Sequence, residues 1–278
     1  MTPGWRYRVS SLWHRPVASL RRSSRHMQRW FKTPLGQEIL QQEIALIEQC
    51  RREYSSDLLV QVSGSGCPLL GKPTNKRQKV VLSSHAPRKS DGDLAGYSWL
   101  VTDFDKLPYP ESSVDFMVLH HALEFSDDPH AVLREAVRVL APQGHLVVIC
   151  FNPHSLFGLR KSFKILLRNQ IPWAHHRLSL PRLSDWLHLM SCPPLNTAGG
   201  FYGLPIQWRK YLRLTSKLDG WFAHLGIPMG GFYVVHASKE MVRPLLSERR
   251  VRKSRLIQFP ATASAVRAKL RVESSSDV

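Results

Sequence analysis

The sequence has no long hydrophobic run. Its longest uninterrupted apolar stretch, Leu146–Phe151, is far shorter than the roughly 20 residues that a membrane-spanning helix needs. The N-terminal residues are basic, but they lack the apolar segment of about 7–15 residues that is typical of secretory signals. We therefore expect a cytoplasmic protein without a transmembrane segment.

Cysteine is also scarce. The four cysteines, Cys50, Cys67, Cys150 and Cys192, are scattered and form no CxxC pair. This spacing argues against a disulfide framework or a zinc site, and it is typical of reduced thiols in the cytosol. The histidines have no ligand-like spacing with acids or thiols, so the sequence predicts no metal site.

Acidic residues are rare at both ends of the chain. Residues 1–31 carry seven Arg and no acid, a net charge of +7, and residues 241–278 carry nine Lys or Arg against three acids, a net of +6. Residues 32–240 hold 23 basic and 18 acidic residues, a net of only +5. We expect three parts: a basic N-terminal extension (1–31), a globular domain (32–240) and a basic C-terminal tail (241–278).

Basic tails of this kind attract RNA or another polyanion through counterion release. The alternative, solvated arms without a specific partner, stays open. For residues 1–31, where aromatics alternate with arginines, two readings also stay open: an amphipathic surface segment and an unstructured leader.

Between the tails, strand-like and helix-like patterns alternate. A helix is expected from Thr33-Pro34 to about Arg52, with Leu40, Ile44 and Ile47 on its apolar stripe. Further helices are expected at 126–140 and 182–190, and strands at 57–62, 79–84, 97–102, 114–121, 145–150 and 230–239. Nearly continuous apolar strands that alternate with helices predict a doubly wound α/β fold with a mostly parallel sheet.

An ordered set of short motifs lies within Val101–Asn152. The set consists of Asp103, Leu107-Pro108-Tyr109, Ser113-Val-Asp115-Phe, His121-Ala-Leu-Glu124-Phe, Asp128-Pro129, Leu133-Arg-Glu135, Arg138-Val-Leu140 and Pro142-Gln-Gly144. It resembles the second half of class I S-adenosylmethionine-dependent methyltransferases, in particular the type 11 group. The resemblance implies a seven-stranded, mostly parallel sheet, S-adenosylmethionine as the cofactor, and methyl transfer to an acceptor that the sequence does not identify.

The resemblance also implies positions for the cofactor. Asp103 would accept a hydrogen bond from the adenine amino group, and Phe104 would lie beside the ring. His120 and His121 close the fourth expected strand near the methyl acceptor, where a histidine acts either as a general base or as a structural residue.

The glycine loop of the family, acid-x-Gly-x-Gly-x-Gly, falls on Gln61, Ser63, Ser65 and Cys67. The glycines that are present, Gly64 and Gly66, are one position out of register. Two alternatives stay open: the loop binds the cofactor in the shifted register, or it has closed.

The family's ribose-binding acid is also missing. Its position falls on Ser83-Ser84-His85, where Ser84 or His85 offers a weaker hydrogen bond to the ribose. An alternative function is therefore a non-catalytic scaffold, with a degenerate cofactor loop, that binds nucleic acid or a partner.

Phe151-Asn-Pro-His154 is interpreted as a structural turn. Residues 155–168 have two readings that stay open: a basic amphipathic helix near the substrate mouth, or a helix with a solvated face.

Overall fold

The computed structural model describes residues 20–52, 54, 58–69, 78–86, 97–155, 176–204, 206, 208, 211, 212 and 230–241. The chain divides into two units, Met1–Val242 and Arg243–Val278, and all described residues belong to the first. The predictions for the C-terminal tail, for residues 1–19 and for the basic helix after Ser155 lie outside the described residues.

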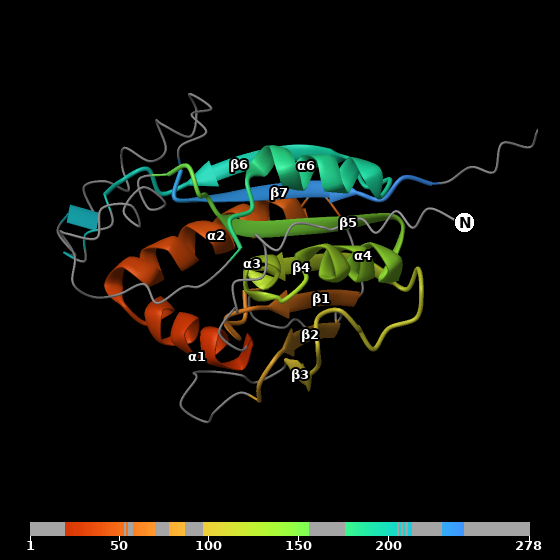
Figure 1. The fold of residues 1–278 in the computed structure, drawn as a ribbon, viewed down its shortest axis with the longest axis horizontal. Coiled ribbons are helices and arrows are strands. Elements are labelled where there is room, and N and C mark those ends of the chain that lie inside the picture. The colour runs from red at the N-terminus through yellow and green to blue at the C-terminus, as the bar shows by residue number, and fades with distance from the viewer. Residues whose placement is uncertain are drawn as a thin grey trace, which may run out of the picture. The chain divides into compact units, whose positions relative to one another are not determined.

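Seven strands form one sheet in the order β3-β2-β1-β4-β5-β7-β6 (Figure 1). They are β1 (Leu58–Ser63), β2 (Gln78–Ser83), β3 (Ser98–Val101), β4 (Val114–His120), β5 (Leu140–Phe151), β6 (Pro194–Gly200) and β7 (Phe232–Ser238). Strands β1 to β5 pair in parallel, and β7 runs antiparallel between β5 and β6. The predicted doubly wound, mostly parallel, seven-stranded fold is confirmed.

The edge strand β6 was not predicted. Its sequence, PLNTAGG, has little hydrophobic content, and most of its residues are exposed. It pairs with β7 alone and ends the sheet. Since an edge strand needs little apolar surface, hydrophobic patterning could not reveal it.

The helices cover both faces of the sheet (Figure 1). They are α1 (Leu20–Phe31), α2 (Pro34–Arg52), α3 (Ala122–Phe125), α4 (Pro129–Val139) and α6 (Leu180–Leu189). Apolar residues of α4 and α6 pack with one set of strand side chains, and those of α1 and α2 pack with the alternate set. Because successive strand residues point to opposite faces, Val60 and Leu59 enter different cores.

Helix α1 comes from the segment that was expected as a basic extension. Its Met27, Trp30 and Phe31 are buried, whereas Arg25 and Arg29 are exposed. For residues 20–31 the structure therefore agrees with the amphipathic reading and not with the unstructured leader.

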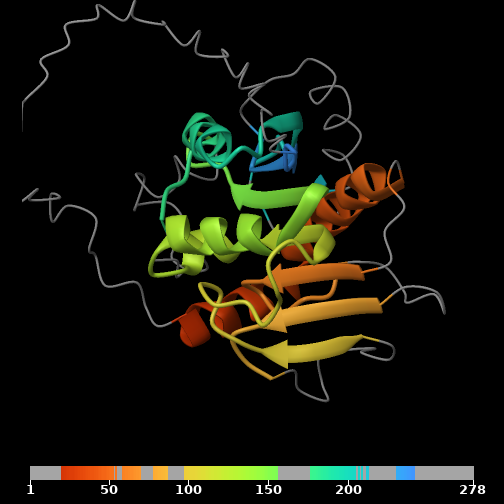
Figure 2. The ribbon, with the colours of Figure 1, turned by 90° about the vertical axis from the view of Figure 1, so that its right-hand side faces the viewer.

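Helices α1 and α2 meet in a tight turn. Thr33 donates its hydroxyl to Trp30 O (2.7 Å) and accepts from Gly36 N (3.2 Å). A Cβ at Gly36 would lie closer than 3.0 Å to the Trp30 backbone. This approach turns the chain so that α1 lies beside the carboxyl ends of β1 and β2 (Figure 2).

No helix within the described ranges is long and apolar enough to cross a bilayer.

Candidate functional site

The carboxyl ends of four parallel strands meet at one edge of the sheet. Ser63 of β1 is in register with Ser83 of β2 and with His120 of β4, and Ser83 is in register with Val101 of β3. After β3 the chain crosses over to β4 on the other side of β1. In open α/β sheets, ligands bind at such a reversal of strand order, so this edge is the candidate site.

The loop after β1 is bonded to the protein itself. Gly66 N donates to Ser63 Oγ (2.9 Å), Cys67 N to Ser65 Oγ (3.2 Å) and Gly64 N to His120 O (2.8 Å). These amide groups are therefore committed to protein acceptors, and the loop is closed in this conformation.

Gln61 holds the rest of the loop. It stands where the family has an acid, is fully buried, and accepts from Leu69 N at 2.9 Å while its amide group donates to Cys67 O. Both ends of its amide group are therefore bonded within the loop.

Gly64 and Gly66 are each glycine for a different structural reason. A Cβ at Gly64 would lie closer than 3.0 Å to the carbonyl of His121. Gly66 has φ of +68°, where L side chains are strained, and it faces the ring of His85. The shifted register therefore follows from the packing of the loop on β4 and β2.

At the end of β2, the buried hydroxyl Ser84 Oγ has no hydrogen-bond partner among the described residues. The neighbouring His85 Nδ1 lies 3.2 Å from Ser24 Oγ of α1. A buried polar group without a partner suits a ligand contact, because leaving it unpaired costs about 1–3 kcal/mol.

Asp103 follows β3 at the same edge and is exposed. Phe104 is only 2% exposed and packs in the core under α4, so its ring is a structural element of this loop. The loop is held to α4, since Leu107 N donates to Glu135 Oε1 at 2.9 Å.

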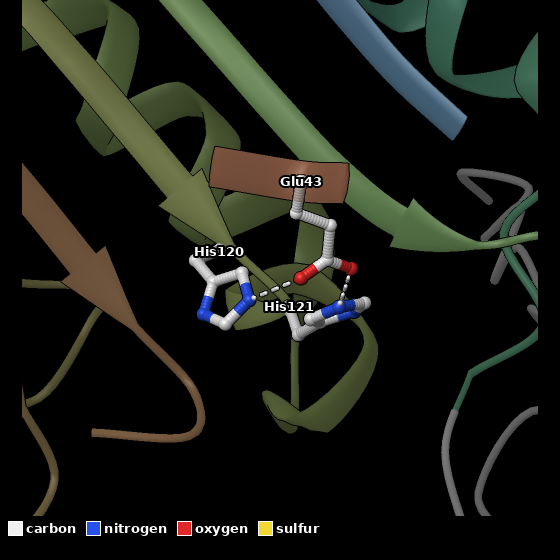
Figure 3. Close-up of side chains that lie close together, drawn as sticks. All are labelled: Glu43, His120 and His121. Atoms are coloured by element: carbon white, nitrogen blue, oxygen red, sulfur yellow. Dashed lines mark hydrogen bonds and ion pairs between the residues drawn. The ribbon is translucent and has the colours of Figure 1, made fainter. Parts of the chain in front are cut away.

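A buried network of two carboxylates and two imidazoles adjoins the loop, and Figure 3 shows three of its members, Glu43, His120 and His121. Glu43 of α2 lies 3.1 Å from His120 Nε2 and 3.0 Å from His121 Nε2, through separate oxygens. His121 Nδ1 lies 2.7 Å from Glu124 Oε2, and His120 Nδ1 lies 3.1 Å from Ser65 Oγ. The network thus joins the candidate cofactor loop to α2 and α3.

Burial and neighbouring charges set the pKa values in this network. Burial disfavours the charged imidazole and lowers the pKa of His120 to about 4, although Glu43 opposes this. For His121, burial is outweighed by Glu124 and Glu43, which raise its pKa to about 9. Burial also opposes the charge on Glu43, but His121 and the bonds from both imidazoles lower its pKa.

A general-base role suits neither histidine in this conformation. Both are 0% exposed. His121 has both ring nitrogens against carboxylates, and the ring nitrogens of His120 face Glu43 and Ser65.

The structure brings most of the predicted residues together. Gln61, the loop Ser63–Gly66, Asp103 and His120 lie at or next to the carboxyl edge, while Phe104 points into the core. Sequence reasoning missed Glu43 as a member of the site. The sequence does contain a sign of its role, because Glu43 lies in the same four-residue repeat as the buried residues Leu35, Ile39 and Ile47.

The predicted turn at Phe151–His154 is confirmed. Asn152 Oδ1 accepts from His154 N at 3.0 Å, and Ser155 donates to Asn152 O.

Part of the chain is similar to known methyltransferases. Residues 75–148 match the family model described as "Methyltransferase domain". The protein YafS of Escherichia coli is 43% identical over 105 residues, which are 38% of this chain and 42% of YafS. The malonyl-[acyl-carrier protein] O-methyltransferase of Hahella chejuensis is 35% identical over 65 residues, 23% of each chain. The chain thus spans less than half the length of these two relatives.

Solved structures support the same fold. A methyltransferase of Thermotoga maritima, described as a possible histamine N-methyltransferase, has a TM-score of 0.54 at 18% identity and covers 76% of this chain and 94% of its own. A chain from the complex of the Haloferax volcanii Trm112 activator with a methyltransferase has a TM-score of 0.53 at 13% identity, covering 77% of this chain and 97% of its own. At these identities the likeness concerns the fold.

Proposed function

We propose that the chain transfers the methyl group of S-adenosylmethionine to an acceptor at the carboxyl edge of the sheet. Its strand order is that of the class I S-adenosylmethionine-dependent methyltransferase fold, and residues 75–148 match the methyltransferase domain model. The observation that carries the proposal is the convergence of two polar groups at that edge. These are the exposed Asp103 and the buried, unpartnered Ser84 Oγ, which lie at the ends of neighbouring strands.

The residues at the edge have separate roles in binding. Asp103 accepts from the adenine amino group, and Ser84 or His85 bonds the ribose. The β1 loop, Gln61 and Ser63–Gly66, together with His120, surrounds the amino-acid end of the cofactor. Asp103 is exposed and Ser84 Oγ has no hydrogen-bond partner among the described residues, so both are open to a ligand. The loop amides first have to leave their protein acceptors.

S-adenosylmethionine supplies an activated methyl group, which a nucleophile takes by direct displacement. The protein's own work is to orient the acceptor and to exclude water, so no dedicated acid or base is required. Two buried aromatic side chains of α1 suit that exclusion: Phe31 packs against His120 and His121, and Trp30 packs against Phe151.

The acceptor is not fixed by the family. The relatives named above include an enzyme that methylates a malonyl-[acyl-carrier protein], and the chain matches only 23% of its length. We propose RNA or another polyanion as the partner, on the charge of the two tails and on the exposed Arg25 and Arg29 of α1. A cytoplasmic location is part of the same proposal, because scattered cysteines suit a reducing compartment.

A second function is favoured by one observation. The amide groups of Gly64, Gly66 and Cys67 are all bonded within the protein, which supports a scaffold that has lost cofactor binding. Such a scaffold would bind nucleic acid or a partner without catalysis.

Calorimetric titration with S-adenosylmethionine separates the two functions. The wild-type chain is expected to bind, and Asp103→Ala to lower the affinity on the order of tenfold to a hundredfold, because the adenine amino group loses its acceptor. Asp105→Ala is the matched control, an exposed acid two residues away. If no heat is released at high micromolar S-adenosylmethionine, methyl transfer is rejected and the scaffold function remains. If Asp103→Ala binds as tightly as wild type, Asp103 is not part of the cofactor site.

Filter binding of RNA at rising salt tests the polyanion partner. Removal of residues 243–278 is expected to flatten the dependence of affinity on salt. An unchanged slope would remove the C-terminal tail from the proposal.

A further inference from the structure

We propose that Glu43, His120 and His121 form a binding site for a divalent transition-metal ion of the zinc type (Figure 3). The inference goes beyond methyl transfer and does not depend on it. It also departs from the sequence-based expectation of no metal site, because the fold alone brings these three residues together.

The donor atoms converge. The two imidazole Nε2 atoms both point at the carboxylate of Glu43, at 3.1 and 3.0 Å from its two oxygens. The ligand atoms of the three residues lie within 4.8 Å of one another. A tetrahedral zinc ion with bonds of about 2.0–2.2 Å needs its ligand atoms roughly 3.3 Å apart. Small shifts of buried side chains would therefore close the site on an ion.

The far side of each imidazole is already oriented. His121 Nδ1 lies 2.7 Å from Glu124 Oε2, and the other oxygen of Glu124 accepts from Phe151 N at 2.7 Å. His120 Nδ1 lies 3.1 Å from Ser65 Oγ. Metal-binding histidines almost always have such a partner on their second nitrogen, which fixes the ring and directs Nε2 at the ion.

The charge of the cluster also suits a dication. Glu43 and Glu124 are both buried, at 0% and 1% exposure, among imidazoles that are fully buried. Two neutral imidazoles, two carboxylates and one divalent cation sum to zero. A dication would compensate both carboxylates, and uncompensated buried charge is strongly unfavourable.

The donor set selects the kind of ion. Two imidazoles and one carboxylate, without thiolate, suit Zn²⁺ and neighbouring transition metals rather than Mg²⁺ or Ca²⁺, which prefer oxygen ligands. Three protein ligands leave one position of a tetrahedral ion for water.

The ion would tie three parts of the domain together. Glu43 comes from α2 and the histidines from the end of β4, while Ser65 of the β1 loop bonds the ring of His120. Phe31 of α1 closes over both rings, with centroids at 5.4 and 5.9 Å. The metal would therefore fix the candidate cofactor loop relative to the N-terminal helices.

Metal content and affinity of the full chain test the proposal. The purified chain, free of any histidine tag, is analysed by mass spectrometry for metals, stripped with a chelator, and titrated with Zn²⁺ against a chromogenic competitor. We expect about one equivalent of Zn²⁺ per chain, and the visible absorption bands of a tetrahedral ion when Co²⁺ replaces it.

Variants locate the ion. Glu43→Gln is expected to lose more than a hundredfold in Zn²⁺ affinity, and Glu124→Gln, which only orients His121, about 10–100-fold. His236→Gln is the matched control. His236 also contacts a second histidine, His145, with ring nitrogens 3.2 Å apart, but neither residue belongs to the proposed metal site. Circular dichroism verifies that each variant is folded.

The proposal is overturned if the stripped wild-type chain takes up no stoichiometric Zn²⁺, or if folded Glu43→Gln or Glu124→Gln binds as tightly as wild type. The wild-type titration decides the matter even where a variant does not fold. None of these measurements involves S-adenosylmethionine, so failure of the metal site and failure of methyl transfer are separate results.

Discussion

His121 Nε2 lies 3.0 Å from Glu43 Oε1, although 78 positions of sequence separate the two residues. The pair connects α2, which precedes the sheet in the chain, with the end of β4 at its centre. Both side chains are fully buried, so the N-terminal helices are part of the candidate site and not an appendage to it. This relationship changes which substitutions are expected to matter.

Gly64→Ala should strongly destabilise the domain. Its Cβ would lie closer than 3.0 Å to the His121 carbonyl, which is backbone and cannot rotate away as a side chain can. We expect a loss of about 3 kcal/mol or more in the free energy of unfolding, at the upper end of overpacking effects. Denaturant unfolding followed by circular dichroism measures it.

The second glycine of the loop provides the comparison. Gly66 has φ of +68°, which Asn tolerates, and its nearest contacts are side-chain atoms of His85 and Ser83. Gly66→Asn should therefore lose about 1 kcal/mol or less. Equal losses at both positions would show that the approach to His121 is not what requires Gly64.

Glu135→Ala should weaken cofactor binding from a distance. Glu135 accepts from Leu107 N at 2.9 Å and from Arg138 at 2.7 Å, and so holds the loop that carries Asp103 to α4. If Asp103 binds the adenine, loss of this support should lower the affinity for S-adenosylmethionine on the order of fivefold, equivalent to about 1 kcal/mol. Calorimetry measures the affinity.

The conservative variant distinguishes loop support from general damage. Glu135→Gln keeps an acceptor for Leu107 N and should retain most of the affinity. An Ala variant that binds as tightly as wild type would mean that the loop position does not depend on Glu135.

Much of the fold was readable because the central strands are nearly continuous apolar runs. The expected strand at 114–121 became β4, with six of its seven residues buried, and the expected helix at 33–52 became α2. The stripe of α2 was less well predicted. Its buried residues include Ile39 and Glu43, whereas the expected Leu40 and Ile44 are only partly buried.

Only some residues of the candidate site could be predicted from the sequence, for a physical reason. Asp103 and the β1 loop belong to local motifs, so a resemblance finds them. The role of Glu43 depends on where α2 crosses the sheet, which is decided by packing across 77 and 78 positions of sequence. Likewise, the serine side chains of the loop turn inward to His120 only because β1 and β4 are neighbours.

Asp128→Ala should destabilise the domain modestly. Asp128 caps α4, where its carboxylate accepts from His130 N and Ala131 N, both at 3.0 Å. The capping bonds and the favourable helix dipole are lost on substitution, at about 1 kcal/mol. Thermal unfolding measures the loss. Asp128→Asn keeps the capping acceptor, so its stability should stay close to that of wild type. If it loses as much stability as Asp128→Ala, the charge and not the capping bond is what stabilises the helix.

The pair His236 and His145 should make the domain sensitive to mild acid. His236 Nε2 lies 3.2 Å from His145 Nδ1 across β7 and β5, and the ring of Tyr54 packs against both. Burial, with the nearby His145 as a second cause, lowers the pKa of His236 to about 4. Burial also lowers the pKa of His145.

The sign of the effect follows from proton binding. Below its ordinary pKa of 6.5, the histidine of the unfolded chain takes up a proton that the folded chain does not accept until about pH 4. Stability is therefore lost as the pH falls from about 6.5 to about 4, by roughly 1–3 kcal/mol for His236. His236→Gln should reduce this loss, whereas His26→Gln, at an exposed position on α1, should leave it unchanged. Denaturant unfolding at pH 7 and pH 4.5 compares the variants; an equal loss in wild type and His236→Gln would assign the acid sensitivity to other groups.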